Sequence, residues 1–287
     1  MIVDVVVANE RERADLVPNR RCLDYANADE GTVWRPRGKS PMSPMIGTAG
    51  WAIPAINSPS FPQAGTALQR YAITLPCVEV NSCFYKPHRR STWERWAASV
   101  PDGFRFAAKI PKEISHGRRL VDATDRLDQF LNEAGGLGGK LAILLLQLPP
   151  SFVFDAGVIA GFLGAVSDRS EAQIVCEPRH ASWFSPGADA LLAERQVARV
   201  AADPAKVQEA GLPGGWRGLT YLRLHGSPVM YRSAYGKERL RSYANAIAVD
   251  LAAGRQTWCM FDNTASSAAL GDALQLLRLF DTTRSVS

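Results

Sequence analysis

Short apolar runs of strand length alternate with longer amphipathic stretches from Ile46 onward. The apolar runs predict strands over residues 46–49, 78–81, 104–110, 141–147, 173–177, 197–203, 220–225 and 257–262. Apolar residues at helical spacing predict helices over residues 63–71, 91–99, 123–136, 156–167, 188–195, 239–253 and 266–280. The strands begin about 30 residues apart on average, which is the length of one βα unit.

Strands that alternate with helices form a parallel sheet, and eight strands are the number that closes such a sheet into a (β/α)8 barrel. An open, doubly wound sheet is the alternative, but residues 47–52 carry no dinucleotide-binding pattern, and the chain has no P-loop. We therefore predict the α/β class and a single TIM-type (β/α)8 barrel over residues 45–287. Residues 1–44 lack a sustained periodicity and end in a Pro-, Gly- and Ser-rich stretch, so we predict a poorly ordered N-terminal extension or leader there.

Composition narrows the class of protein. The 287 residues are 46% hydrophobic and 21% charged, which excludes a disordered or fibrous chain. The five cysteines form no CxxC pair, which favours reduced thiols in the core over a zinc site. No apolar run approaches the ~18 residues of a membrane span, and the N-terminus lacks the basic start of a signal peptide, so we expect a cytoplasmic protein without a membrane partner. A net charge of +5 permits a polyanionic partner without requiring one.

Polar and ionisable residues stand at the C-terminal ends of the predicted strands, from the second to the eighth. They are Glu79, Asn81, Lys109, Gln147, Glu177, Arg179, Asp203, Arg223, His225, Asp262 and Asn263. Barrels carry their active sites at this face, because all parallel strands end there. Burying so many charges without a use is costly. We therefore expect a substrate site at the C-terminal mouth.

The residue types indicate roles within that site. Lys109, Arg179 and Arg223 are expected to hold a negatively charged group of the substrate. His225 is the candidate general acid or base, held by Asp203 or Asp262. We expect His225 to move a proton together with Glu177 or Asp203, with Lys109 as a further catalytic candidate.

Loops just beyond the strands supply the rest of the predicted substrate site. Trp51, Tyr85 and Trp183 follow strand ends and are expected to form part of an aromatic wall that stacks a sugar or a base. His116 and His180 lie where the barrel mouth should be.

A metal site is the alternative use of the same strand ends. Glu177, Asp203, His225 and Asp262 end the last four strands and form a ligand set suited to Mg²⁺ or Mn²⁺. The neighbouring arginines would repel a cation and neutralise these carboxylates themselves. We therefore predict no cofactor and favour no metal, and we keep a divalent cation as the alternative.

Several of these segments also carry a family resemblance. Its motifs are residues 47–51, 78–85, 106–111, 114–116, 147–150, 177–184, 223–226 and 261–263. In this order they resemble the YecE-like family, a domain of unknown function, over about residues 45–280. The resemblance implies a TIM-type barrel, and on fold grounds the family is compared with the endonuclease IV and xylose isomerase barrels. Ala49 and Pro178 depart from the family pattern, and residues 1–44 have no counterpart in it.

Three functions remain open from the sequence. The first is an enzyme that hydrolyses an anionic ligand, a phosphoester or nucleic acid, by acid/base catalysis; it rests on the arginines, the basic charge and analogy of fold. The second is a metal-dependent sugar isomerase or epimerase of the xylose isomerase type, in which Lys109 or His180 assists proton transfer. The third is a non-catalytic barrel that binds nucleic acid or another ligand. The sequence indicates no oligomeric state.

Overall fold

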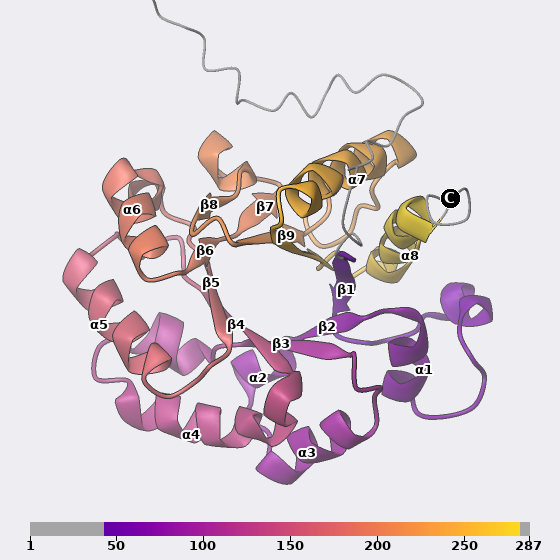
Figure 1. The fold of residues 1–287 in the computed structure, drawn as a ribbon, viewed down its shortest axis with the longest axis horizontal. Coiled ribbons are helices and arrows are strands. Elements are labelled where there is room, and N and C mark those ends of the chain that lie inside the picture. The colour runs from indigo at the N-terminus through magenta and orange to yellow at the C-terminus, as the bar shows by residue number, and fades with distance from the viewer. Residues whose placement is uncertain (1–42, 282–287) are drawn as a thin grey trace, which may run out of the picture.

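The alternating runs of the sequence form a closed ring of parallel strands wrapped by helices (Figure 1). This arrangement comes from a computed structural model that describes residues 43–281. The predicted extension, residues 1–44, lies outside the described residues except for Ser43 and Pro44. The predicted (β/α)8 barrel is confirmed.

The strands lie close to their predicted positions. They are β1 (Met45–Ala49), β2 (Cys77–Val80), β3 (Arg105–Lys109), β4 (Leu141–Gln147), β5 (Gln173–Glu177), β6 (Ala198–Arg199), β7 (Ala201–Asp203), β8 (Gly214–Gly215), β9 (Leu219–Leu224) and β10 (Gln256–Phe261). Strands β1 to β5 pair in sequence order, and β1 also pairs with β10, which pairs with β9.

The sixth barrel strand is divided into two short pieces, and together they close the ring. β6 pairs with β5, and β7 pairs with β9. Only Val200 separates the two pieces, and its N–H donates to the Cys176 carbonyl at 2.8 Å. The predicted strand over residues 197–203 is therefore real but irregular. The two-residue strand β8, which pairs antiparallel with β6, was not predicted.

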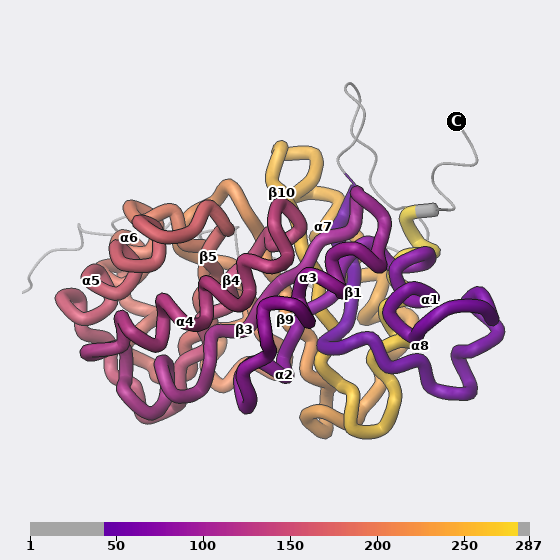
Figure 2. The backbone as a smooth tube through the Cα atoms, turned by 90° about the horizontal axis from the view of Figure 1, so that it is seen from below, coloured from indigo at the N-terminus to yellow at the C-terminus, as the bar shows by residue number. Residues whose placement is uncertain are grey.

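Helices cover the outside of the ring, and Figure 2 shows α4, α5 and α6 flanking the strands on one side and α1 and α8 on the other. The helices are α1 (Ala67–Thr74), α2 (Ser82–Tyr85), α3 (Arg90–Ala98), α4 (Thr124–Ala134), α5 (Ala156–Ser167), α6 (Pro186–Glu194), α7 (Lys237–Ala252) and α8 (Ala268–Asp281). Side chains cap several of them: Thr66, Asp155 and Ser185 accept from the first turns of α1, α5 and α6. No helix between residues 43 and 281 is both long and apolar enough to cross a lipid bilayer.

Two apolar clusters make the core, as a barrel requires. The larger cluster lies between the strands and the surrounding helices and includes Ile46, Phe106 and Leu222. The smaller cluster fills the barrel interior and includes Val175, Tyr221, Trp258 and Met260. Alternate residues of one strand thus belong to different clusters, as Tyr221 and Leu222 do. The last inward-facing residues of the strands, at their C-terminal ends, therefore lie at the mouth of the barrel.

Candidate active site at the C-terminal mouth

Arg223 is the centre of a buried ionic network above the apolar interior of the barrel. Two residues beyond Tyr221 on β9, it points inward, and it is fully buried. Its Nε and Nη2 bind the two oxygens of Glu79, from β2, at 3.0 and 2.6 Å. Nη1 lies 2.5 Å from Glu177 Oε2, and Nη2 lies 3.0 Å from Asp262 Oδ2. One guanidinium therefore joins carboxylates from β2, β5 and the end of β10.

Glu177, at the end of β5, is the most heavily bonded of these carboxylates. Besides Arg223, its Oε2 accepts from Gln147 Nε2 at 3.0 Å. Its Oε1 accepts from Arg179 Nε and Nη2 at 3.2 and 3.1 Å. Burial alone would raise the pKa of Glu177, but Arg223 and His225 outweigh burial and hold that pKa well below its usual value. Glu177 is therefore a permanent negative charge at neutral pH.

His225 lies between two carboxylates, just after β9. Its Nδ1 is 3.0 Å from Asp262 Oδ2, and its Nε2 is 3.3 Å from Glu177 Oε1. Burial disfavours the imidazolium form, but Glu177 and Asp262 overcome this effect and raise the pKa of His225. The chain turns sharply after His225 because Gly226 has a φ of 95°, and a Cβ at Gly226 would lie 2.8 Å from the Ser233 carbonyl oxygen.

Lys109, at the end of β3, is a buried cation that takes no part in the salt bridges of the network. Its side chain is 7% exposed, and its Nζ stands 4.0 Å from the ring centroid of Phe84. Within residues 43–281, no carboxylate oxygen approaches Nζ to salt-bridge distance. Burial and the nearby charge of Arg223 lower the pKa of Lys109 to about 8, although Glu79 and Glu177 oppose this change.

Tyr221 forms the floor of the network, and the sequence analysis missed its part. Its hydroxyl donates to Glu79 Oε2 at 2.9 Å, and its ring stacks on Trp258. Tyr221 shares its strand face with Arg223, so the two-residue period of β9 could have identified it.

A small pocket connects the network to the surface. Its volume is about 20 Å³, and its lining includes Glu177, Arg179, Lys206, His225 and Met230. Lys206 belongs to an irregular loop, where the sequence has no periodicity that could have predicted its position. The pocket leads to His225, which can exchange a proton with a ligand, and to the charged Glu177, and Arg179 and Lys206 give it two cations.

Asp203 does not join the network, contrary to the expectation that it would work with His225. Its carboxylate oxygens bind Arg239 Nη2 at 2.8 Å and the Tyr243 hydroxyl at 2.7 Å, both from α7. The inward residue at this level is Ala202, which lines the pocket. Asp262 therefore holds His225, and Asp203 links the barrel to its outer helix.

Trp183 and Asn263 also face away from the mouth. Trp183 is fully buried, packs on Phe154 with ring centroids 5.1 Å apart, and donates its Nε1 to the Phe152 carbonyl. Asn263 is fully buried and donates to the Ser233 carbonyl and to Asp272. Both residues therefore make contacts that hold the loops. They do not face the mouth, where they were predicted to touch a ligand.

The remaining predicted residues surround the network without bonding to it. The Trp51 ring packs edge-on against Trp96 at 5.0 Å. His180 caps the turn at Ser182. His116 pairs with Ser115 at 2.9 Å. Asn81 has a buried Oδ1 that accepts no hydrogen bond from any described residue.

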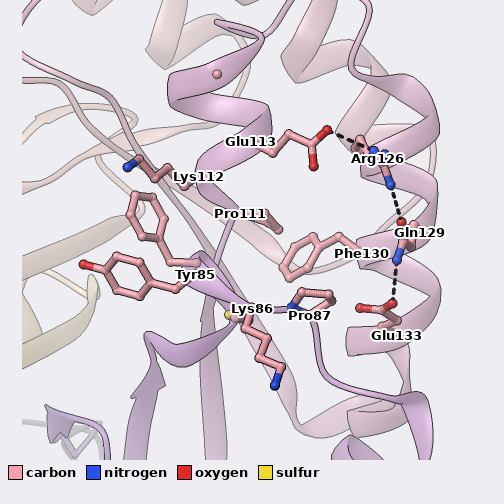
Figure 3. Close-up of a pocket in the computed structure, with 13 residues that line it drawn as sticks. Tyr85, Lys86, Pro87, Pro111, Lys112, Glu113, Arg126, Gln129, Phe130 and Glu133 are labelled. Carbon is pink, nitrogen blue, oxygen red and sulfur yellow. Dashed lines mark hydrogen bonds and ion pairs between the residues drawn. The ribbon is translucent and has the colours of Figure 1, made fainter.

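Tyr85 belongs to a second, wider pocket of about 400 Å³ beside the mouth (Figure 3). The tyrosine is 78% exposed, and the opposite wall is α4. There Arg126 binds Glu113 and Gln129, and Gln129 binds Glu133, so these polar groups satisfy one another. Tyr85 therefore lies outside the ionic network.

The alternative metal set does not fit this geometry. Of its four residues, Asp203 points to α7, while Arg223 stands between Glu177 and Asp262 and binds both. In the part of the chain that the structure describes, no three His, Cys, Asp or Glu side chains are arranged around a common metal position. The donor oxygens that a cation would need are already bonded to an arginine.

The fold and the site define a (β/α)8 barrel whose C-terminal mouth holds a buried ionic network. The family is given by comparison with known proteins. The chain belongs to the family described as "Protein of unknown function DUF72", whose family model matches residues 45–286. The resemblance to YecE-like proteins is confirmed.

Individual relatives agree with this assignment. The UPF0759 protein YecE of Escherichia coli is 30% identical over 165 residues, which is 55% of this chain and 60% of the relative. That match covers little more than half of the relative's length. The UPF0759 protein YunF of Bacillus subtilis is 23% identical over 266 residues, or 82% of this chain and 94% of the relative.

Solved structures show the same fold. A crystal structure of a DUF72 family protein from Enterococcus faecalis has a TM-score of 0.70 at 19% identity and covers 83% of this chain and 96% of its own. A DUF72 family protein from Thermotoga maritima has a TM-score of 0.67 at 19% identity and covers 83% and 100%. At these identities the likeness concerns the fold alone.

Proposed function

We propose that this barrel is an enzyme that binds a small anionic ligand at its C-terminal mouth and hydrolyses a phosphoester by general acid/base catalysis. One observation carries the proposal: His225, which is paired with Asp262, lines a pocket that Arg179 and Lys206 also line. An ionisable pair beneath a cationic pocket is the arrangement expected where an anion must be held and a proton moved.

Charge at the mouth favours an anion. The cations Lys109, Arg179 and Arg223 face the carboxylates Glu79, Glu177 and Asp262, so these groups alone are balanced. Protonation of His225, whose pKa is raised, adds one positive charge. Lys206, on the pocket wall, adds another. An arriving phosphate would therefore meet a positive field and the forked donors of Arg179.

Pocket size favours a small ligand over a nucleic acid duplex. A volume of about 20 Å³ holds about one water molecule and lies far below the roughly 300–1,000 Å³ that small-molecule pockets span, so the ligand group that reaches His225 must be small and the pocket must widen to admit it. A nucleic acid duplex is too wide for this pocket, so a phosphodiester and a single-stranded oligonucleotide are the nucleic-acid substrates to test.

The geometry supports one proton path. In the imidazolium form, His225 donates to Asp262 at 3.0 Å and to Glu177 at the longer distance of 3.3 Å. A ligand oxygen that replaced Glu177 at Nε2 would accept that proton. Hydrolysis then forms a bond between a water oxygen and phosphorus and breaks the bond to the leaving oxygen, which takes the His225 proton. The proton that the water loses restores His225 through solvent.

The test measures turnover and binding together. A panel of phosphomonoesters, a phosphodiester and an oligonucleotide is offered to the protein and to His225→Asn, with phosphate or alcohol release as the readout. We expect His225→Asn to lose turnover by about 100-fold or more, the usual effect of a general acid, and to bind phosphate more weakly by a much smaller factor, because Arg179 and Lys206 still line the pocket. His88→Asn is the matched control, because His88 pairs with Ser82 away from the network.

Each negative result has a definite meaning. Phosphate binding without turnover in any arm would refute the enzyme and leave a binding barrel. Turnover that survives in His225→Asn would refute the assigned acid.

A further inference from the structure

The unpaired amine of Lys109 is a reactive group that hydrolysis does not require. Arg179 and Arg223 are held by carboxylates, whereas Lys109 Nζ contacts the face of Phe84 and, among residues 43–281, no acceptor oxygen. The ammonium group contacts the Phe84 ring, but burial and the charge of Arg223 disfavour the charged form more than the carboxylates favour it. A neutral amine loses much less there, and a neutral amine is a nucleophile.

We propose that Lys109 forms an imine with an aldehyde or ketone that carries an anionic group. The inference goes beyond the proposed hydrolysis, and it shares with that function only the anion held in the mouth. Arg179, which is partly exposed at the pocket, would hold the anion. Lys109 does not line this pocket, but its charge and that of Arg179 both act on His116, so a ligand that extended from Arg179 towards Lys109 would bring its carbonyl carbon to the amine.

The surroundings of Lys109 supply what imine formation needs. The Phe84 ring packs against Lys109 Nζ and lies edge-on to His116 with ring centroids 5.1 Å apart, so the two ionisable groups flank one ring. Burial and the charges of Lys109 and Arg179 lower the pKa of His116, which favours its neutral, proton-accepting form. Asn81, just after β2, has a buried Oδ1 that lacks a donor among the described residues, and this oxygen would accept from a hydroxyl of a ligand that reached it.

The chemical step balances without an oxidant or a metal. The lone pair of Nζ forms a bond to the carbonyl carbon, and the carbonyl oxygen takes up a proton. The nitrogen releases its protons as the carbon–oxygen bond breaks, so the products are the imine and one water molecule. Borohydride then reduces the carbon–nitrogen double bond, which fixes the ligand to Lys109 as a secondary amine.

The experiment is borohydride trapping on the full chain with dihydroxyacetone phosphate, pyruvate and uncharged hydroxyacetone as probes. We expect one adduct, heavier than the chain by the mass of the probe less one oxygen atom, on the peptide that contains Lys109. Lys109→Arg keeps the charge but cannot form an imine, and labelling should fall at least tenfold. Lys112→Arg removes an exposed lysine from the next loop and should label as the unaltered protein does.

The pH dependence gives a second readout. Lys109 is influenced by Arg223, Glu79, Glu177 and Asp262, and its pKa is lowered to about 8. Its labelling should therefore rise between about pH 7 and 9, whereas an ordinary lysine with a pKa of about 10.4 requires a more alkaline solution.

The outcomes separate the ligand classes and the two proposals. Labelling by dihydroxyacetone phosphate alone supports a phosphate-bearing ligand, and labelling by pyruvate alone supports a carboxylate. Equal labelling by hydroxyacetone, equal labelling of Lys109→Arg, or no adduct with any probe would overturn the inference. Phosphoester turnover without an adduct would support the hydrolytic function and refute the imine. An adduct without turnover would support the imine and refute the hydrolytic function.

Discussion

Replacing Lys109 by methionine should make the protein more stable, which is unusual for a buried, close-packed position. The lysine pKa falls from an ordinary 10.5 to about 8 in the folded state. Each pKa unit is worth about 1.4 kcal/mol, so the charged amine destabilises the fold by at most about 3.5 kcal/mol at pH 7. Methionine keeps a long apolar side chain against Phe84, and we expect the free energy of unfolding to rise by about 1–3 kcal/mol.

The sign of the pH dependence follows from the same two pKa values. Between pH 8 and 10.5 the unfolded lysine binds a proton that the folded lysine has lost, so stability of the unaltered protein rises with pH in this window. The advantage of Lys109→Met should thus be full below pH 8 and shrink as pH rises through the window. Urea unfolding at several pH values measures it.

A paired lysine provides the contrast. Lys140 Nζ donates to the carbonyls of Ala97 and Val100, both at 2.8 Å. Lys140→Met removes two satisfied hydrogen bonds and should destabilise the protein. If Lys109→Met lost stability as Lys140→Met does, the lysine would have a bonding partner, and the reasoning on its amine would be refuted.

Two further perturbations test the network. Arg223→Met leaves buried carboxylates unpaired and should lower the free energy of unfolding by about 3–5 kcal/mol. Arg239→Met, at a side chain that is 53% exposed, should lower it by less than about 1 kcal/mol. Similar losses of the two variants in urea unfolding would contradict the buried network. Glu177→Gln should lower the pKa of His225 in an NMR titration, because the Glu177 carboxylate raises it, while Asp203→Asn should leave it unchanged. Since the folded pKa of Glu177 is depressed, its stabilisation is present above about pH 4.5 and lost as pH falls, so the unaltered protein should lose stability in acid more steeply than Glu177→Gln does.

The two-residue period of the strands was enough to predict most of the network. Arg223 and His225 are two residues apart and lie on the same side of the chain at the end of one strand, and Glu177 and Arg179 are related in the same way at the end of another. The structure brings all four together. The barrel supplies the reason, because strands far apart in sequence end at one rim.

Asp203 shows where that reasoning fails. Its strand consists of β6 and β7 around Val200, and Val200 and Ala202 occupy the inward positions. Alanines and valines suit either face of a strand, so the pattern did not reveal that Asp203 points outward. Trp183 failed for a different reason: its partners Phe152 and Phe154 come from another loop, and loop packing has no period.

The mouth contains two kinds of buried charge, and they have different consequences. Arg223 is surrounded by acceptors, so it behaves as structure: its removal exposes three carboxylates to an apolar interior. Lys109 has no such acceptors within the described chain, so its burial lowers stability rather than adding to it. A group that a fold retains at a net loss of stability requires an explanation outside folding. The imine formation that we propose for Lys109 is such an explanation. It requires that replacing this one lysine both stabilise the protein and abolish the adduct.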